Sequence, residues 1–587
     1  MTSSLISRRS ASNLRSLPSH RPRPSSPDPK HSSPSRRMAQ LGKPLKVVIS
    51  LAAFALLSWS AYLAFFTSHF SHLLPGVYPE IITHADLEAL IPLRNEDTNT
   101  TRRLRLFMPA DSPHINLCKT IMSAVALGYP MPTLLNWNRE YNRPDWHFAG
   151  SHIAKLESLL GAIEALLEDA DTNDDVGEDD LAVMMDAYDI WFQLPPSVLI
   201  QRYHQLNREA DERLREHWHT ELQETQFPIP PPRQDIIVTT AKDCFPDRNS
   251  GSDPHYEHWP ESPMPKDMYG EGTDQVPFSF DSARKFKNVR PRCVNSGMIM
   301  GTMGALRDVL RRARDKVDAV VMDGRQLWSD QALFAEIIGE QEMWRKWAKH
   351  LESSWDGGVS HNDLSSLSPE ISNIARAALD GRRFDFGIGL DYNFTTMPPT
   401  CSAEEDGAFV HINDAASLRA ESTKAGVRGD VRIRGIPHEL NNDEDALLAD
   451  VKWGDVPLYS DLFFGSTPVA IHHNAYVGGL KPWRLKHWWD KMWYYPQLRD
   501  LVIRRLGKQD GERKPLARID SEEEGEIVYW APREDEERKT VRVFEPSKKE
   551  GEKHNLRPIE WDSVCQRKGK AEWYDELFGD NKGPLEV

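Results

Sequence analysis

The sequence predicts an α/β fold in which a mostly parallel sheet is flanked by helices, behind one N-terminal transmembrane helix. Strand-like and helix-like runs alternate from residue 103 to residue 192, in the order β-α-β-α-β that is typical of parallel sheets. Residues 47–66 form an uncharged run of twenty residues, which is long enough to cross a bilayer as a helix. The apolar run Leu181–Met185 ends at two aspartates, and ligands of open α/β sheets bind at the carboxyl ends of strands.

The N-terminal part of the chain predicts a type II membrane topology. Residues 1–46 are rich in Ser, Pro and Arg, have no apolar periodicity, and are expected to be disordered. They hold ten Lys/Arg and one acidic residue, so the positive-inside rule places this tail in the cytosol and the chain after Phe66 in the lumen. A buried soluble helix is the alternative for residues 47–66, and their length and lack of charge favour the anchor. A stem is expected over residues 67–102.

The remaining chain is strongly acidic. The net charge is -16, and outside the tail 62 basic residues stand against 87 acidic ones, a net of -25. This balance argues against a general nucleic-acid binder. In a lumenal domain the five cysteines can form disulfides, and an odd count leaves one thiol free or paired between chains. We expect a Cys244–Cys293 pair, and the sequons at Asn99 and Asn393 are consistent with lumenal glycosylation.

The secondary structure is expected to form one main domain over residues 103–500. Within it, residues 350–450 are weakly patterned and are interpreted as an insertion, and residues 501–587 as a charged C-terminal extension. Apolar spacing and turn residues give the expected elements. Strands are predicted at 103–108, 130–137, 181–185, 235–240, 384–390 and 469–474, and helices at 116–127, 150–167, 198–218, from near 303 and from about 329.

Asp186 and Asp189 are the first candidate site residues. In a regular strand, residues three apart point to opposite faces of the sheet. If the chain turns after Asp186, both carboxylates can converge on a hard cation such as Mn²⁺ or Mg²⁺. Alternatively, the aspartates cap a following helix, whose start is indicated by Pro195-Pro196.

Three further segments end or begin elements with polar side chains. Asn295-Ser296-Gly297 favours a turn, and Ser329 before Asp330-Gln331 favours a helix N-cap, so capping is the simpler interpretation of both. His472 follows a short strand, and an imidazole that meets two carboxylates would complete a site suited to Mn²⁺. The glycines of the run 478–483 would allow close approach to a phosphate, with Lys481 as the charge.

Taken together and in this order, these segments resemble the metal-dependent glycosyltransferases of the GT-A fold. They are most similar to the glucosyltransferase domain of procollagen lysyl hydroxylases, and more distantly to glycogenin-type enzymes, over roughly Arg103 to Tyr495. The residues that carry the resemblance are Asp186-Ala187-Tyr188-Asp189, Cys244-Phe245-Pro246-Asp247, Asn295-Ser296-Gly297, Asp330-Gln331, Leu390-Asp391, His472 with Asn474, and the glycogenin-like run Gly478–Trp483.

The resemblance implies a Rossmann-like GT-A domain and a role for each matched residue. Asp186, Asp189 and His472 would hold Mn²⁺ (or Mg²⁺), which grips the diphosphate of a UDP-sugar donor. The other implied roles are Lys481 and Gly479 at the phosphates, Tyr188 against the uracil, Asn295 at the donor sugar, Asp330 and Gln331 near the sugar or acceptor, and Lys155 and Asp391 as further donor-site candidates.

The sequence departs from the family pattern at two places. Leu327-Trp328-Ser329 replaces the Asp-rich run before Asp-Gln, so the resemblance does not extend to the acceptor or to the detailed mechanism. His473 replaces a glycine, so either histidine could be the ligand, and register favours His472.

The resulting prediction is a Golgi or ER type II membrane hexosyltransferase that acts on a protein-linked or glycan acceptor, with retention of configuration favoured. The alternatives are an inactive membrane-tethered module that keeps the fold, and a lumenal phosphodiesterase or nuclease. An inactive module need not keep three metal-competent residues, and the hydrolases usually gather more ligands, for two metals.

Overall fold

The computed structural model describes most of the chain after residue 80. All described residues belong to one unit, Pro79–Val587. The predicted tail (1–46) and anchor (47–66) lie outside the described residues, as does most of the predicted stem. Within the described ranges, no helix is both long enough and apolar enough to cross a membrane. The structure describes residues 81–91, 100–143, 149–168, 176–218, 227–244, 252–275, 285–325, 327, 329–355, 358–360, 366–403, 405–475, 479–507, 514–533, 540–547, 554–566 and 572–586.

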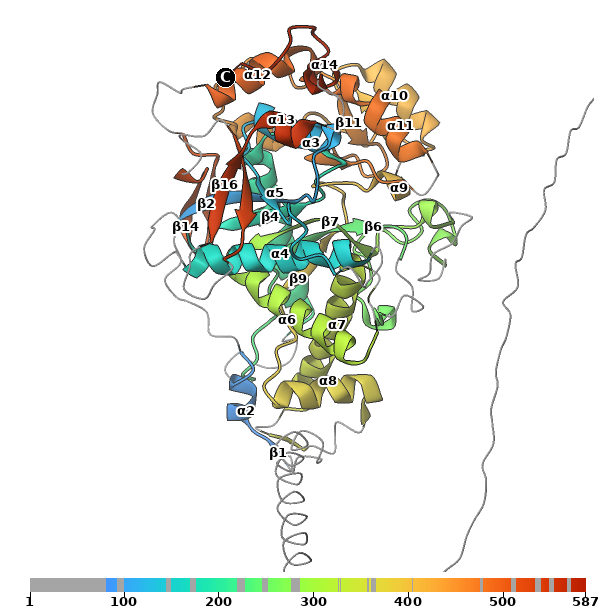
Figure 1. Cartoon of the computed structure of the whole chain (residues 1–587). Helices are drawn as coiled ribbons and strands as arrows, with labels where there is room; N and C mark the ends of the chain where they lie inside the picture. The colour runs from blue at the N-terminus through green and yellow to red at the C-terminus, as the bar shows by residue number, and fades with distance from the viewer. Residues whose placement is uncertain are drawn as a thin grey trace, which may run out of the picture. The chain divides into compact units, whose positions relative to one another are not determined.

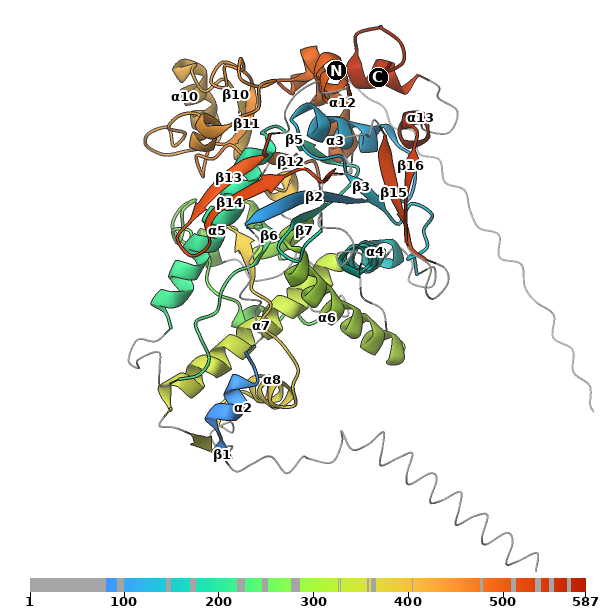
Figure 2. The same cartoon turned by 90° about the vertical axis from the view of Figure 1, so that its left-hand side faces the viewer.

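A mixed, mostly parallel sheet forms the centre of the unit (Figures 1 and 2). Strand β2 (Thr101–Pro109) pairs in parallel with β3 (Thr133–Leu135) on one side and with β4 (Leu181–Met185) on the other. Strand β7 (Cys293–Thr302) runs antiparallel between β4 and β6 (Ile236–Ala241), and β6 pairs in parallel with β9 (Ile388–Asp391). The predicted α/β class with a mostly parallel central sheet is therefore confirmed.

Helices cover both faces of this sheet. They are α3 (Ile115–Ala126), α4 (Ala149–Glu168), α5 (Pro196–Glu216), α6 (Met303–Met322) and α7 (Asp330–Ser353). Successive side chains of a strand point to opposite faces, and β4 shows the result. Leu181, Val183 and Met185 join a core that includes α3 and α5, whereas Ala182 and Met184 join a core that includes α4, α6 and α7. The carboxyl end of β4 thus emerges between two packed layers.

A small second sheet is attached at that end. Strand β5 (Ile190–Phe192) pairs antiparallel with β12 (Ala470–His472), so that His472 faces Ile190. Directly after β5, the side-chain amide of Gln193 donates to the carbonyls of Tyr459 and Pro468 at 2.8 Å each, and its oxygen accepts from Tyr459 N at 2.9 Å. Tyr459 lies on β11 (Leu458–Asp461), which pairs with β10 (Gly407–Val410). These bonds fix segment 458–472 beside the main sheet.

The C-terminal extension completes the main sheet, a role that sequence analysis did not assign to it. Strand β14 (Gly525–Trp530) pairs in parallel with β2 and antiparallel with β13 (Ala517–Ser521). Strand β15 (Val541–Glu545) pairs in parallel with β3 and antiparallel with β16 (Asn555–Ile559). Buried and partly exposed residues alternate in β14 over only a few positions, and so short an alternation is a weak sequence signal for a strand in a charged segment.

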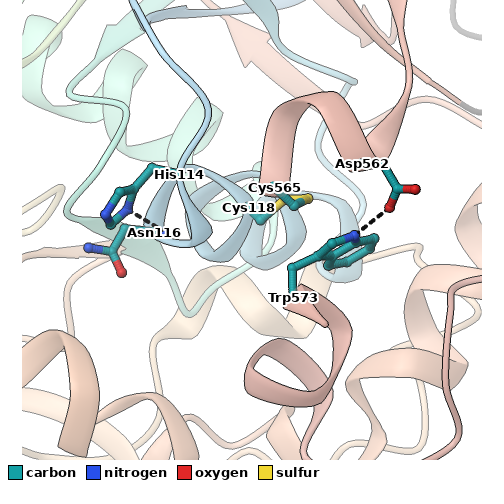
Figure 3. The surroundings of a disulfide bond; sticks show 6 residues. All are labelled: His114, Asn116, Cys118, Asp562, Cys565 and Trp573. Atoms are coloured by element: carbon teal, nitrogen blue, oxygen red, sulfur yellow. Dashed lines mark hydrogen bonds between the residues drawn. A yellow bond between two sulfur atoms is a disulfide. The ribbon is translucent and has the colours of Figure 1, made fainter. Parts of the chain in front are cut away.

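Two disulfides stabilise the unit. The expected Cys244–Cys293 bond is present, and a second bond joins Cys118 on α3 to Cys565 on α13 (Trp561–Cys565), while the buried Cys401 is in neither disulfide. Figure 3 shows the second bond beside Trp573, whose indole donates to Asp562 at 2.6 Å. The remaining α-helices and β-strands are β1 (Ile81–Ile82), α2 (His84–Glu88), β8 (Val359–Ser360), α8 (Pro369–Leu379), α9 (Thr400–Ala403), α10 (Ala415–Lys424), α11 (Leu480–His487), α12 (Leu498–Leu506) and α14 (Trp573–Phe578).

Candidate metal centre

Asp186 and Asp189 occupy a turn between β4 and β5. The backbone N–H of Asp186 donates to Gly297 O at 2.8 Å, which extends the β4–β7 pairing by one residue, and the chain then turns. Asp189 O accepts from His473 N at 2.7 Å, which links the turn to the residue after β12. Helix α5 begins at Pro196 and has Pro195 as its N-cap, with no side-chain cap. The turn therefore brings the two carboxylates together, and the capping interpretation of these aspartates is wrong.

His472 joins the two aspartates. Its Nε2 lies 3.3 Å from Asp189 Oδ2 and 3.7 Å from Asp186 Oδ2, and one ligand atom from each of the three residues lies within 4.8 Å of the others. Asp189 and His472 are buried and Asp186 is half-buried. Two carboxylate oxygens and one imidazole nitrogen form a donor set that suits Mn²⁺ or Mg²⁺. The residues present thus fit the predicted metal.

Gly297 gives the histidine its space. It lies on β7 next to Asp186, and a Cβ at this position would come within 2.5 Å of His472 Cε1 and Nδ1. The Nδ1 atom is itself buried without a hydrogen-bond partner. The neighbouring His473 is not part of the cluster: it is fully buried against Trp191, with ring centroids 4.0 Å apart, and burial lowers its pKa to about 3. Among the described residues, His472 is therefore the histidine that faces the aspartates.

Two lysines neutralise the carboxylates. Lys155 Nζ on α4 lies 2.5 Å from Asp186 Oδ1 and 3.4 Å from Asp330 Oδ2. Lys481 Nζ on α11 lies 2.5 Å from Asp189 Oδ2. Burial by itself raises the pKa of Asp189, but the charges of His472 and Lys481 outweigh it and hold that pKa far below its ordinary value. Burial by itself lowers the pKa of Lys155, but the charges of Asp186 and Asp330 outweigh it and raise that pKa above its ordinary value.

Asp330 and Gln331 lie at the start of α7, close to the cluster. Ser329 caps this helix by accepting from Ala332 N at 3.1 Å, as the sequence predicts. The Asp330 carboxylate is almost fully buried, and burial raises its pKa less than Lys155 and His152 lower it, so it stays ionised. Capping is therefore only part of what this segment does, because Asp330 contacts the lysine that also binds Asp186.

Asn295, Ser296 and Gly297 lie inside β7, so the predicted turn is wrong. The register between β6 and β7 shifts at Val238/Thr239, opposite this triplet, and such a bulge re-aims side chains within a strand. Gln331 Oε1 accepts from Ser296 N at 3.3 Å and from Asn295 Nδ2 at 3.5 Å. Turn propensity of the triplet was outweighed by the pairing of the apolar residues on both sides of it.

Tyr188 lies in the same turn as the aspartates. Its hydroxyl donates to Ser112 O at 2.9 Å and accepts from the N–H groups of Asp111 and Ser112 at 3.1 Å each. The hydroxyl thus ties the loop between β2 and α3 to the turn that carries Asp186 and Asp189, and the ring remains half-buried. Contact with a uracil is a prediction that these bonds do not test.

Asp391 and Gly479 serve the backbone around them. Both oxygens of Asp391 accept hydrogen bonds, one set from the N–H and hydroxyl of Thr395 and the other from those of Thr396. The carboxylate therefore organises the turn after β9, and its donor-binding role stays a prediction. Gly479 has a φ of 83° and is the N-cap residue of α11, the helix that carries Lys481. Gly478 lies outside the described residues.

Three further residues near the site were not assigned a role from the sequence. His152 Nδ1 lies 3.5 Å from Asp330 Oδ1, and Ser296 also hydrogen-bonds that carboxylate through its side chain. Arg484 is buried and donates to Thr400 Oγ1 at 2.7 Å and to Asn474 O at 2.8 Å, just after His472. Helical spacing was the available signal, because His152 precedes Lys155 and Arg484 follows Lys481 by three residues, the distance that places side chains on one face.

A second possible ligand group in the described part of the chain comprises Glu257, His258 and Glu370. Both carboxylates are exposed, and the ammonium of Lys346 lies 3.5 Å from His258 Nδ1. An exposed group with a lysine against its imidazole is a poor cation site, so the candidate centre is the one at Asp186.

Comparison with known proteins adds no assignment. No protein-family model matches the chain, and no curated protein matches it.

Proposed function

We propose that this chain is a metal-dependent glycosyltransferase that moves a hexose from a UDP-sugar to a protein-linked or glycan acceptor. The observation that carries the proposal is the convergence of Asp186, Asp189 and His472 at the carboxyl end of β4. This is the edge of an α/β sheet where ligands bind. The resemblance of these segments to GT-A glycosyltransferases supplies the reaction class.

The metal would be Mn²⁺ or Mg²⁺, held by these three residues. When bound, it neutralises the charge that develops on a diphosphate leaving group as the glycosidic bond breaks. Lys481 contacts the Asp189 carboxylate from α11, and its ammonium is a suitable donor to phosphate oxygens. A metal ion and a lysine on one side of the site would together favour departure of the nucleoside diphosphate.

Asp330 would act on the sugar side of the site. Lys155 joins it to Asp186, so the Asp330 carboxylate lies within one side chain of the metal cluster. Because its pKa lies well below the ordinary value, it is ionised at neutral pH and can accept hydrogen bonds from sugar hydroxyls but cannot donate a proton. Asn295 and Gln331, which hydrogen-bond each other, would position the donor sugar beside it.

The membrane part of the proposal depends on sequence alone. Residues 47–66 would anchor the protein in the Golgi or ER membrane and place the catalytic domain in the lumen. The two disulfides support a lumenal location, because such bonds persist in oxidising compartments.

Nucleotide binding tests the proposal. The purified full-length chain would be titrated with UDP, GDP and their common sugar conjugates, with and without Mn²⁺, alongside Asp189→Ala. Asp520→Ala, at an exposed position of β13, is the matched control. We expect Mn²⁺-dependent binding of a UDP-sugar that Asp189→Ala abolishes and Asp520→Ala keeps. Absence of metal-dependent nucleotide binding would refute the enzyme proposal in favour of an inactive module, and preference for a GDP-sugar would refute the donor.

A further inference from the structure

Lys481 forms an ion pair with the Asp189 oxygen that a metal ion would need as a ligand. Its Nζ lies 2.5 Å from Asp189 Oδ2, and the same oxygen lies 3.3 Å from His472 Nε2. The carboxylate oxygen that faces the imidazole therefore already has a full positive charge beside it. A cation bound between Asp189 and His472 would lie close to that ammonium.

The two lysines of the site differ in how firmly they are held. Lys155 bridges two carboxylates, those of Asp186 and Asp330, and its side chain is 17% exposed. Lys481 contacts Asp189 alone among the described carboxylates, and its side chain is 44% exposed. The half-exposed Lys481 side chain has one carboxylate partner, so it loses fewer contacts than Lys155 would on rotating into solvent, and the buried Asp189 oxygen that it leaves still faces His472 Nε2 at 3.3 Å. Lys481 is therefore the lysine that can leave.

Lys481 lies in the first turn of a short helix. Helix α11 is eight residues long, and Gly479 before it adopts a left-handed φ of 83°. A Cβ at Gly479 would meet no atom within 4 Å, so the start of α11 is uncrowded. Neighbouring side chains therefore leave open space beside the residue from which the helix begins.

Charge balance gives the consequence of this arrangement. A divalent cation that enters the cluster repels the ammonium of Lys481 at short range. A nucleoside diphosphate brings several negative oxygens to the same place and offers Lys481 a partner as good as a carboxylate. The entry of the metal and the arrival of the diphosphate thus favour the same movement of one side chain.

We propose that Lys481 is an exchangeable counter-ion, which holds Asp189 when no donor is present and transfers to the diphosphate when donor and metal bind. Metal alone therefore binds weakly, and metal and nucleoside diphosphate bind cooperatively. This inference rests on the proposed function, since it assumes that the cluster takes a divalent cation and a diphosphate. By thermodynamic reciprocity, the diphosphate strengthens metal binding by the same factor as the metal strengthens diphosphate binding.

The test measures metal affinity directly, without turnover. Free Mn²⁺ would be followed by electron paramagnetic resonance as the purified full-length chain is titrated, with and without saturating UDP. The variants are Lys481→Met and Lys481→Gln, and the control is Lys486→Met, an exposed lysine on the same helix. Because UDP coordinates the metal in every variant, only the difference between the variants and the wild type is informative.

The expected result is that Lys481→Met and Lys481→Gln bind Mn²⁺ alone roughly tenfold more tightly than the wild type, because a repelling charge is gone. UDP should then strengthen Mn²⁺ binding by a smaller factor in these variants than in the wild type, whereas Lys486→Met behaves as the wild type. If the wild type binds Mn²⁺ and UDP but the Lys481 variants match it in both measurements, the counter-ion inference is overturned and the proposed function stands. If Mn²⁺ and UDP fail to bind the wild type, both are overturned.

Discussion

Gly297 leaves the space that the ring of His472 fills. A methyl group at Gly297 would come within 2.5 Å of two ring atoms of His472, although the two residues lie on different sheets of the structure. Gly297 is also the residue whose carbonyl accepts from the N–H of Asp186. One glycine therefore sets the position of two of the three candidate ligands.

The first prediction concerns this glycine. Gly297→Ala should displace the His472 ring and weaken Mn²⁺ binding by about tenfold or more, with a loss of stability of about 1–3 kcal/mol from overpacking. Metal titration and thermal unfolding of the same samples measure the two effects. Gly177→Ala is the control, because the nearest atom to a Cβ there is 4.0 Å away. Unchanged Mn²⁺ affinity in Gly297→Ala would show that His472 is not a ligand.

The second prediction concerns Lys155. Lys155→Met leaves the carboxylates of Asp186 and Asp330 without their shared ammonium, and Asp330 is almost fully buried. Removing one partner of a buried ion pair costs about 3–5 kcal/mol, so unfolding by denaturant should shift clearly. Combining Lys155→Met with Asp330→Asn should recover part of the loss, because the buried charge is then gone. Additive losses in the double variant would contradict this account.

The third prediction concerns pH and Asp461, at the end of β11. Asp461 is buried, and burial together with the nearby charge of Asp406 raises its pKa to about 8. In the unfolded chain this carboxyl ionises near its ordinary value of about 3.9. Between these two pH values the unfolded state releases the proton and the folded state keeps it, so the contribution of Asp461 to stability is fully present below about pH 4 and is lost as the pH rises toward 8.

Asp461→Asn tests the sign of this effect. An amide cannot ionise, and its oxygen can still accept from the N–H groups of Phe463 and Phe464, as Asp461 Oδ1 does at 2.9 Å each. The variant should equal the wild type near pH 4 and exceed it by roughly 1–3 kcal/mol near pH 8 in denaturant unfolding. A wild-type advantage that grows with pH would refute a neutral Asp461.

The fourth prediction concerns the Cys118–Cys565 bond. Cys118→Ser and Cys565→Ser should each lower stability by about 2–5 kcal/mol, and the double variant should lose no more than either single variant, because all three lack the same bond. Thermal unfolding under non-reducing conditions measures this. A double variant that loses clearly more than the singles would show that the cysteines contribute by packing and not as a disulfide.

Local sequence patterns predicted much of the fold. The apolar run of β4, the periodic helix α4 and the N-cap Ser329 have strong local signals, and the structure contains all three. The segment Asn295–Gly297 was misinterpreted because turn propensity is a local quantity, whereas its place in β7 is decided by strands on both sides. The strands after residue 517 were missed for a related reason: β14 and β15 join the main sheet through β2 and β3, which lie far earlier in the chain, so local patterns do not identify these partners.

The three candidate metal ligands were predictable from local sequence. Asp186 and His472 each follow an apolar run, Asp189 comes three residues after Asp186, and the structure brings the three together. Their pairing with Lys155 and Lys481 needs two helices to be placed against the sheet edge, and residue spacing carries no such information. His152 and Arg484 each lie one helical turn from a predicted lysine, so helical spacing places them on the same face, but their partners Asp330 and Thr400 come from other elements.

The Cys118–Cys565 bond has a consequence for how the protein is made. It joins residues separated by 447 positions, and the segments just before Cys565 supply the sheet neighbours of β2 and β3. During synthesis, the first strands of the sheet must therefore wait for nearly the whole chain to leave the ribosome before their edges are covered. Contacts between such distant segments make folding slow and expose unpaired strand edges in the meantime. We expect this protein to depend on chaperones and on thiol oxidation late in its biogenesis, and nascent chains that stop short of Cys565 to be aggregation-prone.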